Sequence, residues 1–185
     1  SLTPSDMTIS DYLITTDKTI VVADSKNSRL VFYSFDLPNQ VGVLTTINYP
    51  GRPLALFYDH TTISLFVGTK DSINEHLYSN PDKIINTYEV DPTDSLLTSI
   101  QVSKKFVAFR TQNSNFYMYE RGQTKINYVL TMFQNVKEIP FLLSEKYSYV
   151  YKFTTTKAET TYLSQPYIVV SNVKEDKIVN VVASS

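Results

Sequence analysis

A pattern of short apolar runs recurs four times along this chain of 185 residues. In the first copy, the runs span residues 12–17, 19–24 and 29–36, and turn residues such as Asp, Asn and Ser separate them. Runs of four to eight residues that are rich in β-branched and aromatic side chains and bounded by turn residues are typical of strands. The repeat therefore predicts four copies of an antiparallel meander, and it strongly constrains the fold.

The period of the repeat is read from the last residue of each middle run. These residues are Asp24, Gly68, Arg110 and Lys152, so the units follow one another at intervals of 44, 42 and 42 residues. A fourth strand is predicted in each of the first three connectors, at residues 41–48, 83–90 and 125–132. A period of about 40–45 residues with four strands per unit is typical of propeller blades.

In this rhythm the chain resembles the β-propeller superfamily, in the manner of divergent WD-repeat blades. The segment Tyr33-Ser34-Phe35-Asp36 lies where that family carries its Trp-Asp ending. The chain contains no tryptophan and no Gly-His pair, so the resemblance rests on strand rhythm and period. It implies an all-β, propeller-like array of four antiparallel meander units of about 42 residues.

Several arrangements of the four units fit the sequence. The units could form a small closed ring, in which a terminal strand at residues 177–182 completes the first blade. They could instead be part of a larger or partner-completed propeller, and a β-sandwich or barrel with evenly spaced hairpins is a further alternative. In each case we expect residues 1–8 to form an N-terminal arm or remnant and residues 9–185 to form one β-repeat domain.

The composition excludes several kinds of chemistry. The chain has no cysteine, which rules out disulfides, thiolate zinc sites and cysteine catalysis. Its four glycines cannot supply a Rossmann or Walker loop, and no apolar run is long enough for a membrane helix. We therefore predict no cofactor and no metal site, and we do not expect an enzyme. No Asn-x-Ser/Thr sequon occurs, which together with the lack of cysteine favours an intracellular location, cytoplasmic or nuclear.

Only a few residues are candidates for catalysis. Asp59 and His60 are adjacent at a predicted inner turn, where they could form half of an acid–base or metal site, or an ordinary solvated turn. Asp17, Asp24 and Asp59 could act as paired carboxylates on glycans, although aspartate is also a common turn residue. We expect His76, the other histidine, to lie on the surface of an outer strand.

Charge is distributed unevenly along the chain, although its net value is only −1. Residues 1–100 hold 6 Lys and Arg against 12 Asp and Glu, whereas residues 101–160 hold 9 against 4. A basic side with interleaved tyrosines is therefore a candidate partner-binding surface, or alternatively strands with lysine facing out and tyrosine facing in. Its proposed members are Lys104, Lys105, Arg110, Arg121, Lys125, Lys146, Lys152, Tyr117 and Tyr119, with Tyr147 and Tyr149 nearby.

These observations favour a non-catalytic protein–protein interaction or scaffold domain within a larger multi-subunit assembly. Its support is the repeat, the charge asymmetry and the 14 tyrosines, because tyrosine is enriched at interfaces. One alternative is a domain that contacts RNA or single-stranded DNA through the basic segment 104–152. Another is a hydrolase or glycan-binding propeller that uses the turn aspartates.

Overall fold

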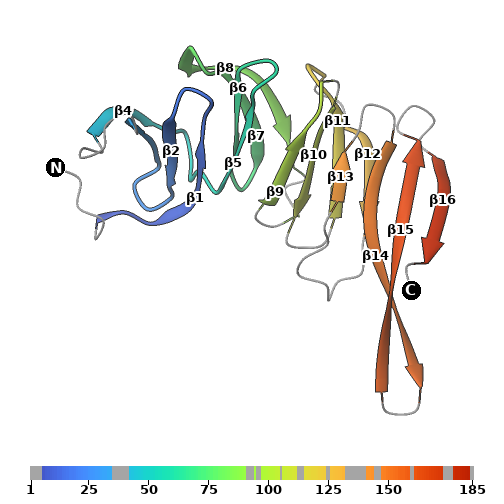
Figure 1. Ribbon diagram of the computed structural model, residues 1–185. Coiled ribbons are helices and arrows are strands. Elements are labelled where there is room, and N and C mark those ends of the chain that lie inside the picture. Colours follow the sequence, from blue (N-terminus) through green and yellow to red (C-terminus); the bar gives the residue numbers. More distant parts are fainter. Residues whose placement is uncertain are drawn as a thin grey trace.

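The protein folds into four antiparallel sheets that follow one another in chain order (Figure 1). The computed structural model describes residues 6–34, 42–90, 94, 97–104, 106–111, 115–123, 126–131, 141–143, 147–158, 161–172 and 177–183. Every secondary-structure element in these residues is a β-strand, so the all-β prediction is confirmed. The described residues contain no helix of the length and apolarity needed to cross a membrane.

Each sheet is a four-strand meander. Sheet 1 contains β1 (Ile9–Ile14), β2 (Thr19–Asp24), β3 (Arg29–Ser34) and β4 (Gly42–Asn48). Sheet 2 contains β5 (Ala55–Asp59), β6 (Ser64–Gly68), β7 (Ser72–Leu77) and β8 (Asn80–Glu89). Sheet 3 contains β9 (Leu97–Val102), β10 (Phe106–Thr111), β11 (Asn115–Glu120) and β12 (Ile126–Thr131). Sheet 4 contains β13 (Phe141–Leu143), β14 (Tyr147–Ala158), β15 (Thr161–Asn172) and β16 (Lys177–Ala183).

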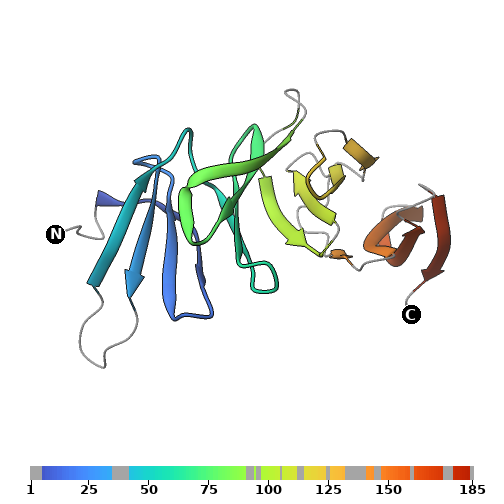
Figure 2. The same ribbon diagram turned by 90° about the horizontal axis from the view of Figure 1, so that it is seen from above.

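The sheets form an open series. The first strands of neighbouring sheets contact one another, β1 with β5, β5 with β9, and β9 with β13. Sheets 1 and 4 lie at the two ends of the molecule, as do the N- and C-termini (Figures 1 and 2). The four units are therefore arranged as consecutive propeller blades, and they do not close into a ring of four.

The prediction that residues 177–182 complete the first blade is wrong. These residues belong to β16, which pairs with β15 as the fourth strand of sheet 4. Sheet 1 takes its fourth strand, β4, from the connector that follows β3. The local pairing is favoured because closing a short loop loses less conformational entropy than joining the two ends of the chain.

Sheet 4 differs from the others in its long central hairpin. β14 and β15 pair in register from Tyr147–Asn172 to Ala158–Thr161 and extend beyond the other strands (Figure 1). The third strand of the fourth unit is therefore the 12-residue β15, which is longer than the six-residue β3 and β11 at the same position of sheets 1 and 3.

Two apolar clusters hold sheets 1–3 together. Between sheets 1 and 2 the buried residues are Val21, Ala23, Leu30, Phe32, Ile47, Tyr49, Leu56, Leu65 and Val67. Between sheets 2 and 3 they are Ala55, Phe66, Ile73, Tyr88, Val90, Ile100, Val107, Phe109, Tyr117 and Tyr119. Sheet 2 contributes to both clusters, and every residue of β6 is buried. Burying one such side chain contributes about 1.5–3 kcal/mol, so the stability of this region comes mainly from contacts between sheets.

Candidate interaction surface

Arg121 joins sheet 3 to sheet 2. It follows β11, and its Nη1 donates to Asp59 Oδ2 at 2.7 Å, at the end of β5. Its Nε and Nη2 both donate to Glu75 Oε1 on β7, at 2.9 and 2.8 Å, and Nη2 also donates to Thr62 Oγ1 at 2.6 Å. The guanidinium lies 5.1 Å from the centre of the Phe66 ring. The Arg121 side chain is 12% exposed, so these contacts place it mainly inside the protein.

Glu75 is held on both oxygens. While Oε1 accepts from Arg121, Oε2 accepts from the Tyr88 hydroxyl and from Asn86 Nδ2, each at 2.9 Å. The main-chain N–H of Gly122 in turn donates to the Tyr88 hydroxyl at 2.9 Å. This network satisfies two largely buried carboxylates, which is the condition under which a buried charge is tolerated.

The protonation state of Asp59 follows from the same contacts. Burial alone would raise the pKa of this carboxyl, but hydrogen bonds from Thr62 and Arg121 outweigh that effect and hold the pKa below its usual value. Asp59 is therefore a fixed anion at neutral pH. A general acid of a glycosidase needs a raised pKa, which this environment does not provide.

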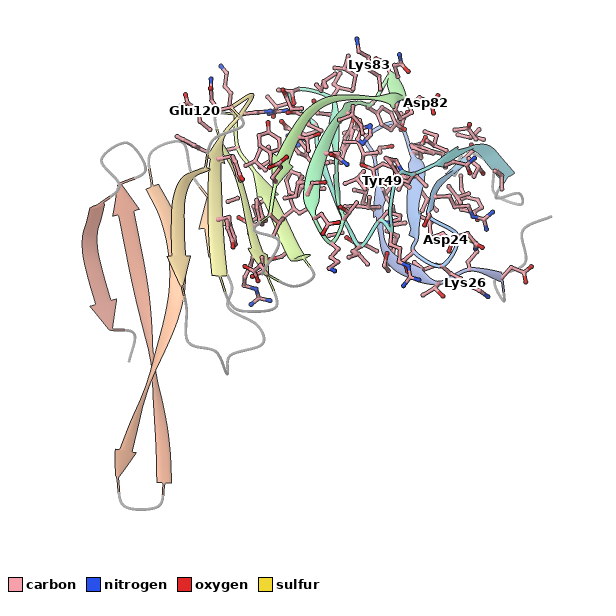
Figure 3. The ribbon with its side chains drawn as sticks, turned by 180° about the vertical axis from the view of Figure 1, so that it is seen from behind. Asp24, Lys26, Tyr49, Asp82, Lys83 and Glu120 are labelled. Carbon is pink, nitrogen blue, oxygen red and sulfur yellow. The ribbon has the colours of Figure 1, made fainter. Side chains whose placement is uncertain are left out.

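The other two turn aspartates also accept hydrogen bonds from groups of the protein. Asp24 is fully buried and accepts from Arg29 Nε at 2.7 Å, and hydrogen bonds from Asn27, Thr8 and Arg29 outweigh the effect of burial and lower its pKa. Asp17 accepts from the Tyr78 hydroxyl at 3.1 and 3.0 Å, and its pKa is likewise lowered. Figure 3 shows that Asp24 and Glu120, the neighbour of Arg121, lie at opposite ends of the sheets.

The two histidines occupy different environments. His60 is exposed in the β5–β6 turn, and the structure records no hydrogen bond between its ring and Asp59. His76 is 2% exposed, and its Nε2 lies 2.9 Å from the hydroxyl of Tyr49, a residue of the cluster between sheets 1 and 2. The prediction of a surface position for His76 is wrong. Within the described part of the chain, no group of three or more possible metal ligands occurs.

Three members of the predicted basic and aromatic set are buried. Arg110 is 6% exposed, Tyr117 4% and Tyr119 1%, so none of the three lies on an open face. Tyr117 and Tyr119 pack in the cluster between sheets 2 and 3, where both stack on Phe109. Burial raises the pKa of Tyr119 to about 12, and its hydroxyl donates to the main-chain oxygen of Glu89.

The structure describes only some of the remaining members of the predicted basic and aromatic set. Lys104 is exposed in the β9–β10 turn. Lys105, Lys125 and Lys146 lie outside the described residues, and Lys152 lies on β14, as do Tyr147 and Tyr149. A partner-binding role for the basic set therefore stays a prediction, and Arg121 is already committed to contacts within the protein.

A surface that the sequence did not indicate lies on sheet 1. Cross-strand pairing places two rows of residues on the face turned away from sheet 2, because paired residues share a face and successive residues alternate. We call this the outward face of sheet 1. Its rows are Ile14, Ile20, Tyr33 and Val43, and Tyr12, Val22, Val31 and Thr46, none of which is charged.

The outward face is partly covered and partly open. Near Asp24, residues 6–8 lie along it: the Thr8 N–H donates to Asp24 at 3.1 Å, and the Tyr33 hydroxyl donates to the sulfur of Met7 at 3.7 Å. The middle of the face is buried, with Val22 6% and Val31 0% exposed, whereas residues on the outer strands β1 and β4 are open, with Tyr12 65%, Ile14 58% and Val43 48% exposed.

The equivalent face of sheet 2 is the one that packs on sheet 1. Its corresponding rows are Tyr58, Leu65, His76 and Ile84, and Leu56, Val67, Asn74 and Thr87. Leu56 occupies the position of Tyr12 and is only 9% exposed, because sheet 1 covers it. The outward face of sheet 1 therefore has the register of a face that packs against a preceding sheet.

Comparison with known proteins shows the fold. No protein-family model and no curated protein sequence matches the chain. A chain in the crystal structure of the mitotic checkpoint complex matches with a TM-score of 0.71 and 14% identity, over 97% of this chain and 52% of that chain. Hydrazine synthase of Kuenenia stuttgartiensis matches with a TM-score of 0.66 and 10% identity, over 99% and 51% of the two chains. Sqt1 of Saccharomyces cerevisiae matches with a TM-score of 0.61 and 8% identity, over 94% and 44%.

The chain thus spans about half the length of the solved chains that it matches. The resemblance to propeller blades that the strand rhythm indicated is confirmed by these structures. Together with the four antiparallel four-strand sheets, they show that this protein has the fold of a partial β-propeller, equivalent to about half of a WD40 propeller chain.

Proposed function

We propose that this protein is a non-catalytic interaction domain that acts as a scaffold within a larger multi-subunit assembly. The observation that carries the proposal is the outward face of sheet 1, which exposes Tyr12 and Ile14 at positions where sheet 2 is packed against a neighbour. An uncharged apolar face rimmed by polar residues is characteristic of a protein-binding site.

The fold and the engaged carboxylates support the same proposal. Propellers serve many functions, so fold alone does not assign one. However, Asp17, Asp24 and Asp59 are bound to groups of the protein, which argues against acid–base catalysis at the turns. The lack of cysteine and of glycosylation sequons supports an intracellular setting for the assembly.

The test is purification of the tagged protein from its source at low and moderate salt, with the stoichiometry of bound proteins measured by mass spectrometry. We expect partners at fixed stoichiometry with the wild type, and their loss with Tyr12→Lys. Ile63→Lys is the matched control, because Ile63 is 54% exposed but lies in the β5–β6 turn. Equal recovery with both variants would contradict the assignment of the face. Recovery only of nucleic acid that is lost at the higher salt would contradict the scaffold function and favour the basic segment 104–152.

A further inference from the structure

β4 is the outer edge strand of sheet 1. Within the described residues it pairs only with β3, and its residues Gly42–Thr46 are all exposed. Sheet 2 has a sheet packed on either side, and its fourth strand, β8, still pairs only with β7 in the part of the chain that the structure describes. A sheet packed on the outward face of sheet 1 would therefore leave the edge of β4 open as well.

A hydrogen bond at the end of β4 identifies the main-chain groups that face away from β3. The N–H of Tyr49, the residue after β4, donates to Ser28 O at 2.7 Å in register with the β3–β4 pairs. Bonded and non-bonded pairs alternate along an antiparallel ladder. Ile47, like Tyr49, therefore directs its N–H and C=O toward β3. Thr46 and Asn48 direct theirs to the open side, where another strand can bind them.

β4 lacks the features that protect the equivalent edge of sheet 2. β8 contains Pro81, Asp82 and Lys83, and it has Glu89 at the register position of Asn48. Proline and charged side chains on an edge strand hinder the addition of a further strand. β4 contains neither. β12 is uncharged as well, and β4 differs from it in belonging to the sheet that carries the outward face.

The usable edge is short, which decides between a second copy and a separate segment. A β-bulge at Leu44 interrupts the register with β3, so the regular part of the edge is residues 45–48. If two copies of β4 paired with Thr46 opposite Asn48, Leu44 of each copy would lie opposite Pro50 of the other. Proline cannot donate to a ladder. A separate extended segment has neither obstacle.

We infer that β4 binds an extended segment of a partner protein, which pairs with Thr46 and Asn48 as an added strand of sheet 1. In this mode the main-chain hydrogen bonds supply affinity and alternate side chains supply specificity. Val43 and Leu44, beside the edge, are 48% and 59% exposed, so the segment that fits is uncharged and rich in β-branched residues. This site goes beyond the proposed function, because it requires neither Tyr12 nor an open outward face.

The experiment measures amide hydrogen exchange of the isotope-labelled protein with and without a peptide probe. The probe is a short, capped and uncharged peptide of alternating threonine and valine. Without it, the amides of Thr46 and Asn48 should exchange rapidly and that of Ile47 slowly, because only Ile47 donates to β3. Saturating peptide should slow exchange at Thr46 and Asn48 by at least about tenfold. The same peptide methylated at every main-chain nitrogen keeps its side chains but has no donors, so it should not bind.

A variant at the edge tests the role of the backbone. Thr46→Pro removes a donor from the open side without removing a bond to β3, and proline is tolerated at such positions. We expect the affinity for the peptide to fall by about tenfold. Thr46→Val is the matched control, because it also loses the hydroxyl but keeps the N–H, and it should bind as the wild type does. Tyr12→Lys should do the same, since Tyr12 lies on β1 at the opposite edge of the sheet.

The outcomes separate this site from the outward face. Unchanged exchange at Thr46 and Asn48 in the presence of the peptide overturns the inference. Equal binding of the methylated peptide also overturns it, and this measurement decides the question if Thr46→Pro fails to fold. Exchange at both amides that slows with protein concentration alone would assign the edge to a second copy instead. If the peptide binds as expected but Tyr12→Lys retains every partner of the tagged protein, the edge site stands and the assignment of the outward face fails.

Discussion

Arg121 donates to Asp59 at 2.7 Å although the two residues are 62 positions apart, and this contact repeats one found between sheets 1 and 2. Arg121 and Tyr78 hold the same position in sheets 3 and 2. Each directly follows the residue of the third strand that pairs with the first residue of the second strand. In the preceding sheet, the partner residue lies opposite the start of the second strand: Asp59 at the end of β5 opposite Ser64, and Thr15, directly after β1, opposite Thr19. The Thr15 and Tyr78 hydroxyl oxygens are 3.3 Å apart. The same position therefore links each pair of sheets, through hydroxyl groups in one case and through an ion pair in the other.

The first prediction concerns the loss of this ion pair. Arg121→Ala leaves the carboxylates of Asp59 and Glu75 largely buried without their cation, so we expect the free energy of unfolding to fall by about 3 kcal/mol. The measurement is urea unfolding at neutral pH. The neighbouring exposed residue provides the control, since Glu120→Ala should change stability by less than about 0.5 kcal/mol. Equal effects of the two substitutions would show that the network contributes nothing specific.

A second prediction concerns pH and His76. Burial lowers the pKa of His76 below its usual 6.5, and the backbone of Pro81 and Lys83, together with the carboxylates of Asp82 and Glu75, offsets this only in part. The unfolded chain therefore binds a proton below a pH of about 6.5 that the folded protein does not, and stability falls as the pH drops. Asp24 and Asp59, whose pKa values are lowered, lose their contribution only below a pH of about 4.

The pH dependence of urea unfolding between about pH 8 and about pH 5 tests this prediction, in a range where histidine is the main titrating side chain. In His76→Gln, which keeps a polar group opposite Tyr49, the decline in stability across this range should largely disappear. The other histidine provides the control, because His60 is exposed and His60→Gln should retain the decline. A decline that persists in His76→Gln and vanishes in His60→Gln would contradict the assignment.

The sequence predicted the strands well because their signal is local. Predicted residues 19–24 coincide with β2, and predicted residues 41–48 and 125–132 contain all of β4 and β12. Which face of a strand is exposed could not be predicted in the same way. Alternation distinguishes an inner from an outer face only where one face is solvated, whereas the inner sheets of a propeller are covered on both faces. Every residue of β10 is buried, Arg110 included, and Tyr117 and Tyr119 face the neighbouring sheet.

The structure also shows where the charge asymmetry lies in the fold, which the sequence alone did not specify. Residues 53–95 of sheet 2 and its connectors hold 2 Lys and Arg against 7 Asp and Glu, whereas residues 97–131 of sheet 3 hold 5 against 1. The contrast is therefore located at the boundary between sheets 2 and 3, where Arg121 meets Asp59 and Glu75. Part of the charge that favoured an external partner binds the two sheets to each other.

A third prediction follows from the backbone of the β5–β6 turn. Ile63 has a φ of 53° and is 54% exposed. A β-branched side chain disfavours this left-handed conformation, which asparagine and glycine adopt more readily. Because little apolar surface is lost, we expect Ile63→Asn to raise the free energy of unfolding by about 1 kcal/mol, measured by thermal or urea unfolding. Ile84→Asn, on strand β8 and without a positive φ, should give no such gain, and stabilisation by both variants would contradict the explanation.

The last prediction separates the two faces of β1. Leu13 packs against the cluster between sheets 1 and 2, whereas Tyr12 points to the outward face and is 65% exposed. Leu13→Ala should therefore destabilise the protein by about 2 kcal/mol, the lower end of the range for leucine, because the side chain is only half-buried. Tyr12→Ala should change stability by less than about 0.5 kcal/mol when unfolding is followed at low protein concentration. If the outward face binds a partner protein, the cost of Tyr12→Ala should increase with the concentration of that partner while that of Leu13→Ala stays constant, because association adds stability by mass action. A cost for Tyr12→Ala that equals that of Leu13→Ala at every concentration would show that the outward face is already filled within one chain.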